Sequence, residues 1–446
     1  MTEIEVVESL MGNGKTFATL RYIEQQAMNN KESRWIYCTE YLSEIENRTK
    51  DEKSLCKHLW RTPIEDDKTQ KFIELLLEPK VQLIAITHAL LLVASKNTYI
   101  NTLIKAKGYS LFLDETIELI NPYTGCLYGD FLTWKAEDKF RIIEPNGKVQ
   151  WVYKDEISGG LGTSFKQLAE DTVNKDIHCG IAGKRVSLVE VEDEVIFTQF
   201  DRVILATYQL QHSLFDAYLS LKGIKKKPCL DIECNKACTK RDIKALITLD
   251  TRHNKKFKGK SMSSTWWEGG GKSGSTLEDI RLVNNTIKNI GDTHGCKGQP
   301  HLLGFTVPSS KIGKSTNPKN IYPRGYPSTV CFMEESSTEV DSNGKPKLVP
   351  TDEKDKANST YIPCNSRACE DYKNKVVMVH AFNRFPHQQV MSFLSDREIP
   401  FSSEVFALNE LLQWLWRSAI RDNERIVVCI LSERMLDLFV NWLEEP

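Results

Sequence analysis

The sequence lacks a long apolar run. No stretch approaches the roughly 20 consecutive apolar residues that a membrane-spanning helix needs. Residues 1–8 carry three glutamates where a signal peptide would have an apolar segment, and neither end carries a lipidation motif. These absences predict a protein that has no membrane segment and works in the cytoplasm.

The sequence also lacks an excess of charge of either sign. Its 59 basic and 60 acidic residues give a formal net charge of −1, so the chain as a whole has no signature of polyanion binding. A nucleic-acid surface would therefore need local segregation of charge. The hydrophobic share of 40% excludes a disordered chain, and the length of 446 residues predicts two or three domains.

A tight C-x2-C pair, common in zinc sites, is missing too. Twelve cysteines are scattered along the chain, and a reducing cytoplasm predicts that they are free thiols. Cys229, Cys234 and Cys238 lie close in sequence, with His253 further on. This spacing leaves zinc binding open, with separated thiols as the alternative.

The sequence does contain an alternation of short apolar runs with amphipathic segments. That pattern predicts a parallel sheet covered by helices on both faces, which is an α/β fold. In the first half, the predicted strands are 5–7, 35–38, 83–86, 110–113 and 203–206. In the second half, they are 301–307, 375–379 and 425–430. The predicted helices include 17–28, 89–104, 405–419 and 435–443.

This organisation predicts two α/β lobes with a basic segment between them. We place the first lobe at 1–215, a basic insert or linker at 216–290 and the second lobe at 291–446. Within the first lobe, the dipeptide Asn146-Gly147 predicts a hairpin turn, which we interpret as part of an insertion before the last strand. The polar stretch 334–359 predicts a long surface loop.

The segment between the lobes is rich in positive charge. Residues 217–275 hold 14 Lys or Arg against 5 Asp or Glu, and Phe257, Trp266 and Trp267 lie among them. This mixture suits single-stranded nucleic acid, because the charges neutralise phosphates and the rings stack on bases. A solvated charged loop is an equal alternative.

The segment SLMGNGKT follows the first predicted strand and opens the first predicted helix, which is the context of a phosphate-binding loop. Gly12 and Gly14, with Asn13 between them, allow the backbone to curl so that N–H groups converge on phosphate oxygens. Lys15 is expected to reach the phosphates of ATP, and the Thr16 hydroxyl to hold Mg²⁺. The alternative is a plain glycine turn with an exposed lysine.

Two acids, Asp114 and Glu115, follow the predicted strand 110–113. In phosphate-loop ATPases, an Asp at such a strand end binds the Mg²⁺ and the following Glu polarises the attacking water. The alternative is an ordinary strand end with two solvated acids.

With these two motifs, the chain resembles a superfamily 2 helicase of the DEAD/DEAH type, and more narrowly the phage-encoded members of that group. The resemblance covers most of the chain. It implies two RecA-like lobes with parallel sheets, which hydrolyse ATP with Mg²⁺ and act on nucleic acid, DNA in preference to RNA. Shorter segments in the family's order imply nucleic-acid contact or coupling roles for Thr39, Thr87, Thr207 and Arg367.

The same resemblance implies an arginine-finger segment at Gln413, Arg417 and Arg421. Because these residues are spaced by four, we expect them on one stripe of a helix, where an arginine would neutralise charge developing on the γ-phosphate. The family's second arginine lies three residues after the first, whereas here it lies four after, so the acting arginine is left open. A basic stripe on a solvated helix is the alternative.

These features predict an ATP-dependent DNA helicase or translocase of phage replication, with replication proteins as partners in the bacterial host cytoplasm. A second reading is a nucleic-acid-stimulated ATPase that remodels or loads a partner protein without unwinding. A third alternative is a phage packaging motor, which would need a nuclease lobe with clustered carboxylates, whereas the second half shows Gln413, Arg417 and Arg421 instead. A fourth is a phosphate-loop regulator that binds only proteins, and stimulation of ATP hydrolysis by DNA would exclude it.

Overall fold

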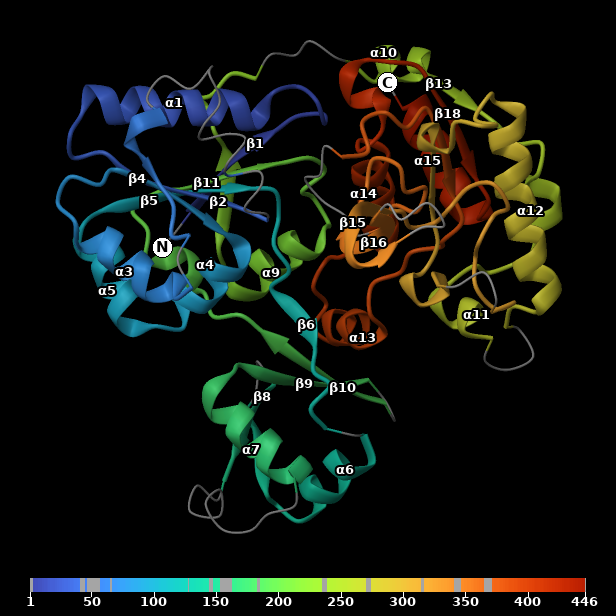
Figure 1. The fold of residues 1–446 in the computed structure, drawn as a ribbon. Helices are drawn as coiled ribbons and strands as arrows, with labels where there is room; N and C mark the ends of the chain where they lie inside the picture. The colour runs from blue at the N-terminus through green and yellow to red at the C-terminus, as the bar shows by residue number, and fades with distance from the viewer. Residues whose placement is uncertain are drawn as a thin grey trace. The chain divides into compact units, whose positions relative to one another are not determined.

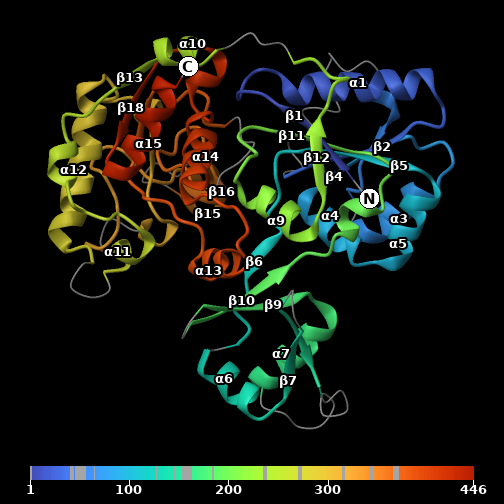
Figure 2. The same cartoon turned by 180° about the vertical axis from the view of Figure 1, so that it is seen from behind.

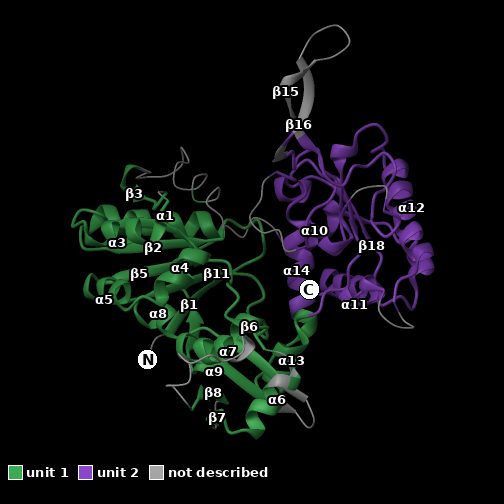
Figure 3. Cartoon of the chain, turned by 60° about the horizontal axis from the view of Figure 1, so that its bottom comes forward, with its two compact units in different colours: residues 1–236, 386–405 green, residues 237–385, 406–446 purple. Residues whose placement is uncertain are grey.

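The computed structural model divides the chain into two compact units (Figure 3). Unit 1 comprises Met1–Lys236 and Pro386–Val405, and unit 2 comprises Ala237–Phe385 and Phe406–Pro446. The structure describes residues 3–40, 45, 57–64, 66–126, 128–143, 147–152, 163–182, 185–234, 239–269, 274–313, 317–340, 346–364 and 371–445. None of the helices in these ranges combines the length and the apolar character needed to cross a membrane.

A parallel sheet forms the centre of unit 1 (Figure 1). Within the described ranges it has seven strands in the order β12-β1-β11-β5-β2-β4-β3, and each neighbouring pair runs parallel. The strands are β1 (Glu3–Glu8), β2 (Arg34–Thr39), β3 (Trp60–Arg61), β4 (Leu83–Thr87), β5 (Tyr109–Asp114), β11 (Val203–Thr207) and β12 (Lys225–Pro228). The five strands predicted from apolar runs in the first half are all present.

Both faces of this sheet are buried. Ile36 and Leu111 belong to the core on one face, and their neighbours Tyr37 and Phe112 belong to the core on the other, as the two-residue period of a strand requires. Helix α1 covers the second face, and the remaining helices cover the first (Figures 1 and 2). The helices are α1 (Lys15–Asn29), α3 (Lys68–Leu77), α4 (His88–Ser95), α5 (Thr98–Ala106), α8 (Val195–Thr198) and α9 (Leu214–Lys222), with a 3-10 turn at Lys57–Leu59.

The predicted helix 89–104 is in fact two helices, α4 and α5. The break falls at Asn97, whose side chain accepts hydrogen bonds from the N–H groups of Tyr99 and Ile100. An Asn side chain competes in this way for backbone donors and starts a new helix.

A second, antiparallel sheet is inserted in unit 1 between β5 and β11. Its order is β6-β10-β9-β8-β7. Its elements are β6 (Ile120–Pro122), α6 (Tyr128–Ala136), β7 (Phe140–Ile143), β8 (Lys148–Trp151), α7 (Thr163–Asn174), β9 (Ile177–Ala182) and β10 (Arg185–Val191). The predicted hairpin is confirmed as the pair β7–β8, and Gly147 has the left-handed φ of 67° that such a turn requires. Helix α13 (Gln388–Asp396) packs on β9 and β10.

Unit 2 also has a parallel sheet at its centre. In the described part of the chain its order is β13-β18-β17-β14, and all pairs are parallel. The strands are β13 (Ile247–Leu249), β14 (Leu303–Thr306), β17 (Val377–His380) and β18 (Ile426–Ile430). The helices are α10 (Lys240–Leu246), α11 (Ser264–Glu268), α12 (Leu277–Thr293), α14 (Ser403–Leu415, which belongs to unit 2 from Phe406 on) and α15 (Glu433–Glu444), with 3-10 turns at Asn254–Phe257, Pro300–Leu302, Ser309–Lys311 and Ala419–Asp422.

Two sequence predictions about segments are wrong. The stretch 334–359, predicted as a surface loop, forms much of an antiparallel hairpin of β15 (Cys331–Val340) and β16 (Pro346–Lys354). The stretch 216–290, predicted as a basic insert, is divided between the two units, because β12 extends the sheet of unit 1 while β13 and α12 belong to unit 2. The division also assigns 386–405 to unit 1, so the predicted boundaries at 215 and 291 do not match it.

Some basic residues of that stretch form ion pairs within unit 1. Lys226 and Lys227 lie on the edge strand β12 and pair with Asp216 and with Glu3, respectively, which suits an edge strand that must avoid pairing with other chains. Trp267 is fully buried in the core of unit 2. Phe257 and Trp266 are also buried there, so the predicted stacking surface for bases is absent from the described residues. Lys255, Lys256 and Lys258 are exposed.

Candidate phosphate-loop site

The glycine loop between β1 and α1 has the shape that its sequence predicts. Strand β1 ends at Glu8 and α1 begins at Lys15, so the loop connects a buried strand directly to a helix. Gly12 and Gly14 have φ of 83° and 72°, in the left-handed region that other residues rarely adopt. A Cβ at Gly14 would meet nothing within 4 Å, so the backbone angle, and not crowding, requires glycine.

The loop directs backbone donors at the space in front of α1. Gly14 is the N-cap of α1 and gives no side-chain cap, and the first turn of the helix holds no acidic residue. The first N–H groups of a helix then point outward with the positive end of its dipole, which suits a phosphate. The Asn13 amide donates to Ser9 Oγ at 3.2 Å and closes the loop.

Lys15 lies inside the loop. Its side chain is 7% exposed, and its ammonium donates to the carbonyl oxygens of Ser9 (2.8 Å) and Leu10 (3.2 Å). The alternative of an exposed lysine on a plain turn is therefore wrong. The positive charge sits at the centre of the curled backbone, where a phosphate oxygen would replace the two carbonyls.

Thr16 and Asp114 meet beneath the loop. The Thr16 hydroxyl donates to Asp114 Oδ1 at 2.8 Å, and the Tyr37 hydroxyl donates to Oδ2 of the same carboxylate at 3.1 Å. Asp114 is 6% exposed at the last position of β5. The carboxylate also acts on the neighbouring Cys38, where burial first and the charge of Asp114 second raise the pKa of the thiol well above its usual value.

The Thr16 and Asp114 oxygens fit a hard divalent cation. Mg²⁺ prefers oxygen ligands and in nucleotide sites is held by one or two protein groups together with phosphate and water oxygens. Among the residues that the structure describes, no cluster of three or more His, Cys, Asp or Glu could hold a metal alone. A cation here would therefore depend on a bound phosphate for its other ligands.

Glu115 has an unusual backbone. Its φ is 69°, and its N–H donates to the carbonyl of Ala206 on β11 at 3.0 Å. A left-handed conformation in a residue other than glycine costs about 1–2 kcal/mol. Such strain occurs at functional sites, where the surrounding structure maintains it. The side chain is partly exposed at the edge of the sheet where the glycine loop lies.

Three threonines predicted as nucleic-acid or coupling residues also lie at this edge. Thr39, Thr87 and Thr207 are the last residues of β2, β4 and β11, and the parallel register places Thr39 opposite Thr87 and Thr207 opposite Glu8. Thr39 and Thr207 are buried, so in this conformation their side chains cannot contact nucleic acid directly. The Thr87 hydroxyl caps α4 by accepting the N–H of Leu90. Coupling roles for these residues stay predictions.

Sequence reasoning missed two residues of the site. Tyr37 orients Asp114, and Glu8 accepts the N–H of Leu210 at 3.1 Å, tying the loop after β11 to the end of β1. Tyr37 lies in an apolar run that predicted only a strand, and a hydroxyl among such residues was the available signal. For Glu8, the available signal was an acid at the last position of β1, directly before the glycine loop.

The prediction that Gln413, Arg417 and Arg421 lie on one stripe of a helix is wrong. Helix α14 ends at Leu415, and Ser418 is extended, with its hydroxyl donating to the Leu415 carbonyl at 2.6 Å. Gln413 is therefore on the helix, Arg417 follows its end and Arg421 lies in a separate 3-10 turn. Ser418 competes for the last carbonyls of the helix, which ends the regular spacing.

Arg417 and Arg421 also differ in how far their side chains are exposed. Arg417 is 7% exposed, while Arg421 is partly exposed. Arg367, predicted to have a nucleic-acid contact or coupling role, lies outside the described residues, as does Cys238 of the suggested zinc set.

The described fold defines an α/β protein with two parallel sheets, and the sheet of unit 2 belongs to a Rossmann-like domain. The family model of the YonV C-terminal Rossmann-like domain matches residues 241–443. The chain is 24% identical over 464 residues to the SPbeta prophage-derived uncharacterized protein YonV of Bacillus subtilis (strain 168), a match that covers 100% of this chain and 99% of that protein. The likeness is distant and spans both units, and neither description names an activity.

Proposed function

We propose that unit 1 binds and hydrolyses ATP with Mg²⁺. The observation that carries the proposal is the contact of Thr16 with Asp114 directly beneath a glycine loop that encloses the Lys15 ammonium. A lone glycine turn or a lone acidic strand end would each be ordinary. Here the two lie together, because a hydrogen bond joins Thr16 to Asp114, 98 residues further along the chain. A candidate phosphate-binding element and a candidate cation-binding element therefore share one site.

Each residue then has a chemical task. Lys15 exchanges its two carbonyl partners for phosphate oxygens and neutralises their charge. Thr16 and Asp114 would hold Mg²⁺, which when bound supplies further charge neutralisation at the phosphates. Glu115 orients and polarises the attacking water, and its strained backbone fixes the direction of its side chain.

We further propose that hydrolysis drives work on nucleic acid, as a DNA helicase or translocase with two RecA-like lobes in phage replication, in the host cytoplasm. Two observations support this part: unit 2 is a second parallel α/β unit, and the distant relative is prophage-derived. The resemblance of the glycine loop and the Asp114-Glu115 pair to motifs of superfamily 2 helicases is the sequence argument for it. Replication proteins are the partners that this role implies.

One observation favours the second candidate, a nucleic-acid-stimulated ATPase that remodels or loads a partner protein without unwinding. The aromatic residues expected to stack on a single strand, Phe257, Trp266 and Trp267, are buried in unit 2. A surface with exposed lysines alone neutralises phosphates without separating bases. Strand displacement distinguishes the two candidates.

The test measures ATP hydrolysis without polymer and with single-stranded DNA, duplex DNA or RNA, with Lys15→Ala as the inactive control. We expect stimulation by DNA in the wild type and none in the variant. A parallel strand-displacement assay should show unwinding for the helicase and none for the remodelling ATPase. Equal hydrolysis by wild type and Lys15→Ala would overturn the proposal.

A further inference from the structure

A turn of unit 2 carries three lysines within four positions, and we call residues 254–260 the lysine turn. It follows β13 and begins with the 3-10 turn Asn254–Phe257. Lys255, Lys256 and Lys258 are exposed, and no ion pair joins any of them to another residue that the structure describes. Their ammonium groups are therefore available to a ligand.

The backbone of the lysine turn is fastened to the core of unit 2. Phe257 is 1% exposed and packs in that core. The side-chain amide of Asn254 donates to the carbonyl of Ile430, the last residue of β18, at 2.6 Å. Gly259 has a left-handed φ of 75°, and the N–H of Lys260 donates to the Phe257 carbonyl at 3.0 Å. The turn therefore holds its lysines at the carboxyl edge of the sheet, and little backbone entropy is lost when a ligand binds.

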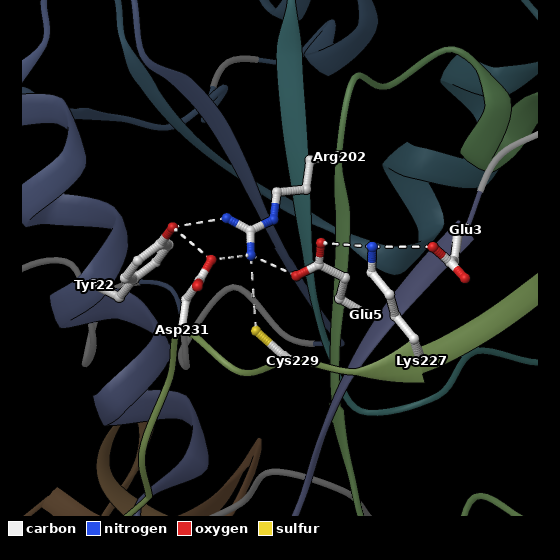
Figure 4. A network of polar contacts seen from close by, with 7 residues as sticks. All are labelled: Glu3, Glu5, Tyr22, Arg202, Lys227, Cys229 and Asp231. Atoms are coloured by element: carbon white, nitrogen blue, oxygen red, sulfur yellow. Dashed lines mark hydrogen bonds and ion pairs between the residues drawn. The ribbon is translucent and has the colours of Figure 1, made fainter.

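Two other lysines of the predicted basic insert are neutralised by carboxylates. Figure 4 shows Lys227 of unit 1 between Glu3 and Glu5, and both carboxylates form ion pairs with it. In unit 2, Lys260, the last residue of the lysine turn, pairs with Asp279 at 2.6 Å. The excess positive charge of the turn therefore comes from its three exposed lysines.

The charge of the lysine turn acts on His253, which lies directly before it. The pKa of this imidazole is lowered, first by burial and second by the positive charge of Lys256. The carboxylate of Asp250 raises the same pKa by a smaller amount, and Arg252 lowers it further. The electrostatic effect of the lysine thus exceeds that of the carboxylate, so the potential beside the turn is positive.

The chemistry of the lysine turn suits phosphate and not bases. An ammonium group on a flexible stem is a compact charge that binds a phosphate oxygen. Stacking on bases would require an exposed ring, but Phe257, Trp266 and Trp267 are all buried. The turn can therefore recognise only the charge of a nucleic acid. Duplex DNA presents about one charge per 1.7 Å of its axis, roughly twice the density of one strand, so charge alone favours the duplex.

We propose that the lysine turn binds the phosphate backbone of duplex DNA without contacting the bases. The inference rests on the proposed function and adds to it the form of nucleic acid that unit 2 holds. A single strand exposes its bases, and its binding gains from aromatic surfaces, which the turn does not offer. A duplex encloses its bases and exposes two rows of phosphates, which the three lysines can neutralise.

The experiment measures the affinity of the full chain for duplex DNA at a series of salt concentrations, by fluorescence anisotropy. Single-stranded DNA and polyglutamate, which represents an acidic peptide, are measured in parallel. The triple variant Lys255→Ala, Lys256→Ala, Lys258→Ala should reduce the slope of log affinity against log salt by about 2 to 3, because each lost phosphate contact removes about 0.9. The loss of affinity should be equal for duplexes of different sequence.

Two controls accompany this variant. Lys→Arg substitution at the same three positions keeps the charge and should keep the slope, which separates a loss of charge from a loss of fold. Lys31→Ala, Lys80→Ala and Lys105→Ala together remove the same charge from exposed positions that precede β2, β4 and β5, and they should also keep the slope.

The outcomes separate the inference from the proposed function. If the wild type binds no nucleic acid, the nucleic-acid part of the proposed function fails and the inference fails with it. If the wild type binds duplex DNA and the alanine variant keeps its slope, or loses affinity for single-stranded DNA alone, the inference is overturned while the proposed function stands. Loss of polyglutamate binding with unchanged DNA binding would identify an acidic peptide as the partner and would also overturn the inference.

Discussion

The Thr16 hydroxyl donates a hydrogen bond to Asp114 at 2.8 Å, so two segments 98 residues apart share one side-chain contact. Strand β11 lies between β1, which precedes the glycine loop, and β5, which ends at Asp114. The contact therefore joins residues from two strands that are not neighbours, at the edge of the sheet where the strands have their carboxyl ends. In open α/β sheets ligands bind at this edge.

This contact predicts how nucleotide binding depends on the cation. Asp114→Asn keeps the shape of the side chain and removes its charge, so we expect ATP affinity to lose most of its dependence on Mg²⁺. Thr16→Ser keeps the hydroxyl and should bind as the wild type does. Titration of ATP at a series of Mg²⁺ concentrations measures both. An Asp114→Asn variant with a full Mg²⁺ response would contradict the assignment.

Lys15→Ala should abolish hydrolysis, since it removes the charge at the centre of the loop. The lysine is buried and bonded to two loop carbonyls, so the variant should also lose about 1 kcal/mol of stability or less, because removal of a buried charge offsets part of the lost hydrogen bonds. Steady-state phosphate release and thermal unfolding measure the two effects. Lys31→Ala, an exposed lysine just beyond α1, should change neither.

Glu115 offers a matched pair of substitutions. Glu115→Gln should keep ATP binding and stop hydrolysis, because the amide cannot polarise water. Glu115→Gly should also stop hydrolysis and should unfold at an equal or higher temperature, because glycine adopts a φ of 69° without strain. Single-turnover hydrolysis and thermal unfolding measure these. Normal turnover in Glu115→Gln would remove this residue from the mechanism.

The sequence predicted the local elements well wherever one physical signal dominated. Buried parallel strands require continuous apolar runs, and the runs 35–38 and 110–113 are indeed β2 and β5. The glycine loop was predictable because Gly12 and Gly14 supply backbone angles that few residues can adopt.

The failures arose where tertiary burial or a local cap decided the outcome. Trp266 and Trp267 lie beside many lysines in sequence, yet they pack inward against α12 and the sheet of unit 2, which composition cannot show. Spacing by four predicted one stripe for Arg417 and Arg421, but the regular helix ends at Leu415, before both residues. The role of Tyr37 depends on the pairing of β2 with β5, a long-range fact.

The corrected arginine geometry changes what substitution should do. Arg417 is buried, so Arg417→Ala should destabilise unit 2 by about 2 kcal/mol or more. Arg421 is partly exposed, so Arg421→Ala should retain the fold and, if it serves hydrolysis, lower kcat more than it raises KM. Arg425→Ala, at an exposed position nearby, is the control. Unchanged kcat in the Arg417 and Arg421 variants would end the arginine-finger hypothesis.

Lys375 predicts a pH dependence of stability in unit 2. Its side chain is fully buried, with its nitrogen donating to the Ala357 carbonyl at 2.8 Å, and burial lowers its pKa from 10.5 to about 7. The folded state therefore releases this proton at a lower pH than the unfolded state does. Between pH 7 and 10.5 the unfolded state binds more protons, so stability rises with pH; below pH 7 the full penalty of burying the charge remains.

Lys375→Met keeps an unbranched side chain, one atom shorter, without the charge. We expect it to raise the free energy of unfolding most at pH 6 to 7, with an advantage over the wild type that shrinks by up to about 1.4 kcal/mol per pH unit as the pH rises toward 10. Urea unfolding at each pH measures the difference. Lys373→Met, two residues earlier at an exposed position, controls for the substitution itself. A pH-independent difference between Lys375→Met and the wild type would mean that Lys375 titrates alike in the folded and unfolded states, which its burial argues against.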